Sequence, residues 1–187
     1  MYSTNYNQVI LVDTNDNEIG VMEKLEAHEK GLLHRAFSIF VFNENKELLL
    51  QRRALNKYHS AGLWTNTCCS HQAPGETNLI AGNRRLKEEM GMSCELMPVF
   101  HFVYKADLEN NLTEYELDHV MIGFSNSQPI INTEEVCDYK WITIEDLIYD
   151  LKEHPEHYTV WFNLIFEQHL HQLNTIIEHE SLQTRNF

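Results

Sequence analysis

Positive charge is scarce in this sequence. Only 14 Lys and Arg residues stand against 28 Asp and Glu residues, and the formal net charge is −14. A nucleic-acid partner is therefore not expected, because binding to a phosphate backbone usually requires a basic face. A chain this acidic can bind an anion only where its few cations lie close together, or where bound metal ions supply positive charge.

Long apolar runs are absent as well. No segment reaches the ~18 apolar residues that a helix needs to cross a bilayer. Residues 1–8 lack the basic-then-apolar pattern of a signal peptide. Hydrophobic residues still make up 43% of the 187 residues, which is enough for a packed core. We therefore expect a cytoplasmic protein with no membrane partner.

Cysteine is limited to four residues, and no two of them form a Cys-x-x-Cys pair, which excludes a zinc ribbon. In a reducing compartment these cysteines are expected to be thiols. Histidine is abundant by comparison, with eleven residues. A single histidine is most often a surface or core residue, so only histidines that belong to a cluster are informative here.

The chain shows no repeat, low-complexity linker or change of composition, so we predict a single domain over residues 1–187. Strands are expected at residues 9–13, 36–42, 47–51, 95–104 and 115–124, and helices at 78–90, at 143–151 and from 159 to 171 and beyond. Gly91 and Thr143 stand where a helix C-cap and an N-cap belong. This mixed order predicts an α+β fold with α/β/α layers. Residues 175–187 are expected to form a frayed tail.

Two short segments contain histidines that are candidates for metal ligands. His28 and His34 are six residues apart, which does not suit one helix face, so Gly31 is expected to break the segment. In an extended segment Cys69 and His71 share a face, whereas Cys68 points away into the core. Cys69 is either a small buried apolar residue or, given its polar neighbours, part of a reactive site.

Two acidic residues stand at the head of an apolar strand. Glu114 and Glu116 share a face of this strand, where like charges repel each other. The pair is either an exposed acidic turn or a site with a cation between the two carboxylates.

Local positive charge is found in two places. Arg53 and Lys57 follow the strand predicted at residues 47–51, which would form a hairpin with residues 36–42, and together with Lys24 they supply the cations that a phosphate-bearing substrate requires. Arg85 and Glu89 are neighbours on one face of the predicted helix, a pattern that an ordinary surface salt bridge shares.

Five segments together resemble the type I isopentenyl-diphosphate isomerases of the Nudix superfamily. They are residues 24–37 (KLEAHEKGLLHRAF), 51–71 (QRRALNKYHSAGLWTNTCCSH), 75–91, Tyr104 and 114–116. The resemblance implies a Nudix-type fold, in which helices flank a mixed sheet. It also implies a core at residues 32–167 and an N-terminal strand extension, residues 1–31, that contributes metal and substrate residues. Ser70 and Arg85 depart from the Nudix hydrolase pattern, which weakens the alternative of a nucleoside diphosphate pyrophosphohydrolase.

The resemblance also implies a set of site residues. One divalent ion would be bound by His28, His34, His71, Glu114 and Glu116, and the substrate diphosphate by Lys24, Arg53, Lys57 and Arg85. Three imidazoles with two carboxylates suit Mn²⁺ or Zn²⁺ better than Mg²⁺. Glu89 would hold a Mg²⁺ ion against the diphosphate.

The implied activity is the interconversion of isopentenyl diphosphate and dimethylallyl diphosphate in isoprenoid biosynthesis. Cys69 would exchange one proton with the substrate, and Glu116 with Tyr104 would exchange the other, in either direction. The face of Trp161 would stabilise the carbocation by a cation–π interaction, although plain core packing is an alternative for this residue. The expected partner is the small-molecule substrate, and the expected state is a monomer or a weak homodimer.

Overall fold

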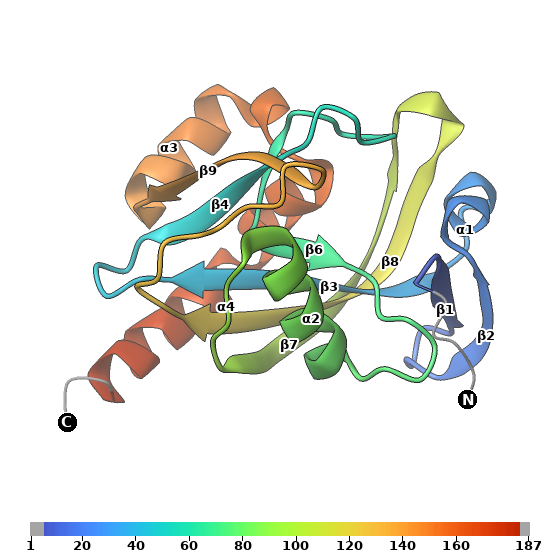
Figure 1. Cartoon of the computed structure of the whole chain (residues 1–187), viewed down its shortest axis with the longest axis horizontal. Helices are drawn as coiled ribbons and strands as arrows, with labels where there is room; N and C mark the ends of the chain where they lie inside the picture. Colours follow the sequence, from blue (N-terminus) through green and yellow to red (C-terminus); the bar gives the residue numbers. More distant parts are fainter. Residues whose placement is uncertain (1–5, 184–187) are drawn as a thin grey trace.

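The chain folds around one mixed β-sheet (Figure 1), in a computed structural model that describes residues 6–183. In chain order the elements are β1 (Gln8–Val12), β2 (Glu18–Glu23), α1 (Lys24–Lys30), β3 (His34–Phe42), β4 (Leu48–Arg53), β5 (Trp64–Thr65), β6 (Cys68–Ser70), α2 (Asn78–Met90), β7 (Leu96–Asp107), β8 (Thr113–Phe124), β9 (Val136–Ile142), α3 (Ile144–Glu153) and α4 (Val160–Gln183). Two short 3₁₀ turns, η1 (Glu109–Asn111) and η2 (Pro155–His157), complete the order.

Strand β3 is the centre of the nine-stranded sheet. It runs parallel to β8 along its whole length, with His34 beside Glu116, and antiparallel to β1, β4 and β6. Strand β7 pairs with β8, and β9 pairs with β4, both antiparallel. The sheet is therefore mixed, and the predicted α+β class is confirmed.

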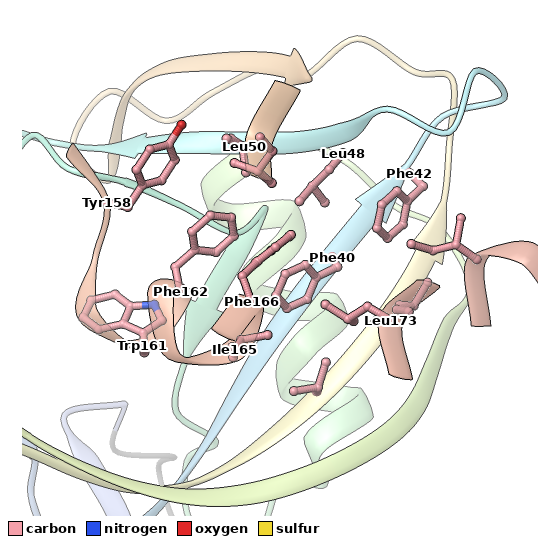
Figure 2. Packing of buried hydrophobic residues seen from close by; sticks show 14 of the residues in the cluster. Phe40, Phe42, Leu48, Leu50, Tyr158, Trp161, Phe162, Ile165, Phe166 and Leu173 are labelled. Carbon is pink, nitrogen blue, oxygen red and sulfur yellow. The ribbon is translucent and has the colours of Figure 1, made fainter. Parts of the chain in front are cut away.

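The two faces of the sheet have separate hydrophobic cores. Because side chains alternate along a strand, Phe40 and Phe42 of β3 pack on one face and Ile39 and Val41 on the other. The first core includes helices α3 and α4, and Figure 2 shows Phe162 of α4 among these side chains. The second core is covered by α2, on the opposite side of the sheet in Figure 1. The predicted α/β/α layering is confirmed.

Helix boundaries agree with the capping residues in the sequence. Helix α2 spans the predicted residues 78–90 and ends at Gly91, whose φ of 64° is left-handed. Its N-cap is Thr77, which accepts a hydrogen bond from the backbone of Ile80. Thr143 caps α3 in the same way. Among the helices of residues 6–183, none combines the length and apolar composition that a bilayer crossing needs.

Several elements differ from the sequence-based prediction. Strands β2 and β9 and helix α1 were not predicted, and β7 continues to Asp107. Strands β2 and β9 each pair with one neighbour. Most residues of β2 are exposed and most of β9 are half-buried, so neither strand has a clear apolar alternation. The prediction of a frayed tail at residues 175–187 is wrong for its first part, because Ile177 is buried and α4 continues to Gln183. Residues 184–187 lie outside the described residues.

Candidate active site and metal centre

The five predicted metal ligands converge on one point. His28 lies in α1, His34 begins β3 and His71 follows β6, while the two carboxylates belong to β8. One ligand atom from each of the five residues lies within 4.8 Å of every other. The parallel pairing of His34 with Glu116 explains part of this arrangement. Gly31 explains another part, because its left-handed conformation ends α1 and turns the chain into β3.

Backbone carbonyls fix the tautomers of two of these histidines. The Nδ1 atom of His28 lies 2.6 Å from the carbonyl oxygen of Lys24, and that of His34 lies 2.8 Å from the carbonyl oxygen of Leu32. A carbonyl only accepts, so each Nδ1 carries the hydrogen. Both Nε2 atoms therefore present bare lone pairs to the centre of the cluster, as metal ligands do.

The centre of the cluster contains facing acceptor atoms. His28 Nε2 lies 3.0 Å from Glu114 Oε2, yet both atoms are buried without a hydrogen-bond partner. His71 Nε2 lies 2.8 Å from Glu116 Oε1 and 3.2 Å from His34 Nε2. Lone pairs directed at each other are stabilised by a cation between them. This donor set therefore fits a divalent ion.

The two carboxylates have opposite pKa shifts. Burial, and then the charge of Glu116, raises the pKa of Glu114 to about 7. Burial opposes ionisation of Glu116 too, but its interactions with His34 and His71 hold its pKa well below the usual value. Glu116 is thus the carboxylate that remains charged in the buried cluster at neutral pH.

A central pocket lies beside this cluster, and the groups of the proposed proton transfer line it. Cys69, Tyr104, Glu116 and Trp161 all contribute to its wall. Burial raises the pKa of the Cys69 thiol to about 12, so the thiol remains protonated at neutral pH. Tyr104 Oη donates a hydrogen bond of 2.6 Å to Glu116 Oε2. The pocket therefore combines a thiol that carries a proton with a charged carboxylate that can accept one.

Trp161 belongs both to the pocket wall and to the hydrophobic core. Its side chain is 4% exposed and packs in the cluster shown in Figure 2. Its Nε1 donates to Thr65 Oγ1 at 3.0 Å, which fixes the ring plane. The guanidinium of Arg53 lies 5.3 Å from the ring centroid. The ring thus already contacts one cation, as a cation–π partner does.

The four predicted diphosphate contacts, Lys24, Arg53, Lys57 and Arg85, line the same pocket. Burial, and then repulsion from Lys57 and Arg85, lowers the pKa of Lys24. Glu135, which was not predicted, forms ion pairs with both Lys57 and Arg85. An anion in the pocket would therefore meet positive charge that is only partly neutralised.

The predicted Mg²⁺ ligand Glu89 borders the pocket but lies outside the five-residue cluster. Its carboxylate accepts from Arg85 Nη2 at 2.6 Å and from Gln51 Nε2 at 2.9 Å. The neighbouring Arg84 instead donates twice to Glu76, at 2.8 Å each. Glu89 thus faces the pocket cations, whereas Arg84 and Glu76 fasten the start of α2.

Sequence reasoning missed three polar residues of this region, Glu135, Asp118 and His59. Asp118 is buried two residues after Glu116, on the same face of β8, and accepts from Ser38 at 2.8 Å. The two-residue period would have identified Asp118. His59 lines the pocket and lies 3.4 Å from Glu114 Oε1, but no local pattern marks it. Glu135 lies 78 residues from its partner Lys57, and no local signal connects them.

Comparisons with known proteins give the following matches. The NUDIX domain family model matches residues 32–163. A protein of Pectobacterium atrosepticum named "Isopentenyl-diphosphate Delta-isomerase" is 52% identical over 159 residues, covering 85% of this chain and 89% of that protein. A Photorhabdus laumondii protein named "Isopentenyl-diphosphate Delta-isomerase 2" is 55% identical over 157 residues, covering 84% and 89%. A crystal structure of a Deinococcus radiodurans protein, with a TM-score of 0.65 and 20% identity, covers 78% of this chain and 89% of that one, and supports the fold alone.

Proposed function

The chain belongs to the NUDIX family and, within it, to the isopentenyl-diphosphate Delta-isomerases, and on this premise we propose that it interconverts isopentenyl diphosphate and dimethylallyl diphosphate. One observation carries the proposal beyond the family name. A protonated thiol, a charged carboxylate and a group of cations line the same pocket. A hydrolase that attacks a phosphate with water has no use for such a thiol.

The reaction moves a double bond by one carbon, so one proton is added and another is removed from the neighbouring carbon. Cys69 provides the first proton, because burial keeps its sulfur protonated at neutral pH. Glu116 accepts the second, and the hydroxyl of Tyr104 stabilises its charge. The roles reverse in the opposite direction, since the reaction is an equilibrium.

Protonation of an unactivated alkene produces a tertiary carbocation. Trp161 would stabilise this cation through its electron-rich face, without a nucleophilic atom that could trap it. The hydrogen bond to Thr65 supports this role, because it prevents the ring from turning edge-on. The buried surroundings keep water away from the cation and from the allylic product, which loses diphosphate readily.

The diphosphate would be held by Lys24, Arg53, Lys57 and Arg85, in charge-assisted contacts. The ion pairs of Lys57 and Arg85 with Glu135 support this role, because they hold both side chains at the pocket before the substrate binds. Glu135 thus adds a second carboxylate, beside Glu89, that faces these four cations.

We propose that the cluster of three histidines and two glutamates binds Mn²⁺ or Zn²⁺, and that Glu89 takes up Mg²⁺ together with the diphosphate. When bound, these ions would offset the repulsion between the carboxylates and neutralise the phosphate oxygens. The proposal includes a cytoplasmic enzyme that acts as a monomer or weak homodimer in isoprenoid biosynthesis. The four free thiols support a reducing compartment, and sedimentation of the purified protein tests the oligomeric state.

An NMR experiment tests the activity. The purified enzyme is incubated with isopentenyl diphosphate, Mg²⁺ and Mn²⁺ in D₂O. We expect dimethylallyl diphosphate that carries deuterium. Release of inorganic phosphate or pyrophosphate without this product would instead indicate a hydrolase, and no conversion with either metal would overturn the proposal.

A further inference from the structure

His59 is a buried histidine next to the metal cluster, with no role in the proposed reaction. It lies in the loop between β4 and β5, is 4% exposed and lines the central pocket. Its Nε2 lies 3.4 Å from Glu114 Oε1, and its ring lies edge-on to Trp161 at 6.1 Å. It is not one of the five residues whose ligand atoms converge.

The contacts of His59 determine where its hydrogen lies. Nδ1 lies 3.3 Å from the hydroxyl of Ser60, which can donate a hydrogen bond to it. With Nδ1 as the acceptor of this hydrogen bond, the imidazole carries its N–H at Nε2. Nε2 is also the ring atom that lies 3.4 Å from Glu114 Oε1, a carboxylate oxygen that can only accept.

The two oxygens of Glu114 therefore have different partners. Oε1 faces His59, while Oε2 faces the bare Nε2 of His28 at 3.0 Å. Among the described residues Oε2 has no hydrogen-bond partner, so without His59 at Oε1 the carboxylate could turn away from the cluster. A donor at the outer oxygen is the usual way in which a protein orients a carboxylate ligand.

We propose that His59 is a positioning residue that fixes the Glu114 carboxylate so that Oε2 remains directed at the metal cluster. This inference rests on the proposed metal site. It assigns His59 to the support of a ligand and not to the ligand set itself.

The backbone around His59 is fastened to the diphosphate end of the pocket. Arg53 donates to the carbonyl oxygens of His59 and Ser60, at 3.1 and 3.2 Å. The backbone N–H of Ser60 donates to Glu109, and Ser60 itself has a left-handed φ of 49°. Arg53 is thus connected through the loop to Glu114, so the diphosphate-binding end and the metal end of the pocket share one support.

The test measures metal affinity in the absence of substrate. Metal-free wild type, His59→Leu, His59→Gln and the exposed control His171→Gln are titrated with Mn²⁺, and free Mn²⁺ is counted by electron paramagnetic resonance. We expect His59→Leu to weaken binding about 10–100-fold, as loss of a supporting hydrogen bond does. His59→Gln places an amide donor the same number of bonds from the backbone and should restore most of the affinity. His171→Gln should match the wild type.

A Co²⁺ absorption spectrum distinguishes support from direct ligation. A positioning role predicts that His59→Gln retains the wild-type spectrum, because the ligand set is unchanged. A changed spectrum in this variant, or equal weakening by Leu and Gln, would overturn the inference, as would wild-type affinity in His59→Leu.

A fourth variant covers the case in which His59→Leu does not fold, as judged by circular dichroism. His59→Asn keeps an amide beside Ser60 but is too short to reach Glu114, so its affinity should fall as that of His59→Leu would. Wild-type affinity in His59→Asn would overturn the inference. Failure of the wild type to bind Mn²⁺ would instead overturn the proposed metal site, so the two failures are distinguishable.

Discussion

Tyr104 and Glu116 face each other across strands β7 and β8, and the phenolic Oη donates to Oε2 at 2.6 Å. The other oxygen of Glu116, Oε1, lies 2.8 Å from His71 Nε2. A single carboxylate thus connects a phenol of the substrate pocket with an imidazole of the metal cluster. A change to either neighbour alters the same proton acceptor.

The first prediction concerns the phenol. Tyr104→Phe removes only the hydroxyl and keeps the ring stacked on Phe102, with centroids 5.7 Å apart. We expect kcat to fall on the order of 10²-fold with KM little changed, because Tyr104 makes no contact to the diphosphate cations. Steady-state kinetics measure both constants. Tyr115→Phe, whose side chain points to the opposite side of β8, is the control, and a raised KM with unchanged kcat in Tyr104→Phe would contradict the assigned role.

The second prediction concerns the thiol. Cys69→Ala removes the only protonated thiol that lines the pocket among the described residues. We expect kcat to fall by about 10²-fold or more, with a smaller change in affinity for the diphosphate. Cys94→Ala is a matched control, since Cys94 packs in the core under α2. Isomerase activity at the full rate in Cys69→Ala would remove Cys69 from the reaction.

The third prediction concerns the paired carboxylates and uses metal removal. At pH 8 the metal-free enzyme holds both Glu114, with a pKa raised to about 7, and Glu116 as charges in a buried cluster. When the pKa of a carboxyl is higher in the folded than in the unfolded protein, the folded protein loses stability as pH rises through the folded pKa. Glu114→Gln should therefore raise the Tm of the metal-free enzyme by a few degrees.

The same variant should reduce the Tm increase that Mn²⁺ produces, because a neutral amide is a poorer ligand. Differential scanning calorimetry with and without chelator measures both effects, and the exposed Glu44→Gln should change neither. A lower Tm of metal-free Glu114→Gln would show that the two carboxylates do not repel each other in the folded protein.

The parts of the fold that could be predicted have local causes. Helix α2 has periodic apolar residues and ends at a glycine. Helix α3 is capped at its N-terminus by the side chain of Thr143. Strands β2 and β9 have no such pattern, because most residues of β2 are exposed and most of β9 are only half-buried. Their positions depend on pairing with β1 and β4, which is tertiary information.

Part of the candidate site could likewise be predicted from local sequence, and part depends on tertiary structure. The two-residue period alone places Glu114 beside Glu116, and Cys69 beside His71. That these pairs meet depends on β3, which lies antiparallel to β6 on one side and parallel to β8 on the other, and so joins segments far apart in the chain. His59 approaches Glu114 because its loop is hydrogen-bonded to Glu109 and Asn110, in the turn between β7 and β8, so local sequence does not reveal it. The catalytic and metal-binding roles of these residues stay predictions until the variants are measured.

The last prediction connects a helix cap with the pocket. Gly91 has a φ of 64°, and a Cβ atom at this position would lie 2.5 Å from the carbonyl oxygen of Ile130. That segment docks on the end of α2, with Asn132 N donating to Glu89 O at 2.8 Å, and it leads to Glu135 beside Lys57. Gly91→Ala must therefore strain the cap and displace the segment.

We expect Gly91→Ala to lower the free energy of unfolding by about 1–3 kcal/mol, measured as a lower urea midpoint at unchanged m-value. KM should rise as well, because Glu135 no longer holds Lys57 at the pocket. Gly20→Ala is the matched control, since a Cβ there meets nothing within 4 Å, and its stability should stay near that of the wild type. Equal urea midpoints for both variants would mean that the Ile130 segment accommodates the added Cβ without loss of stability. KM should then be unchanged too.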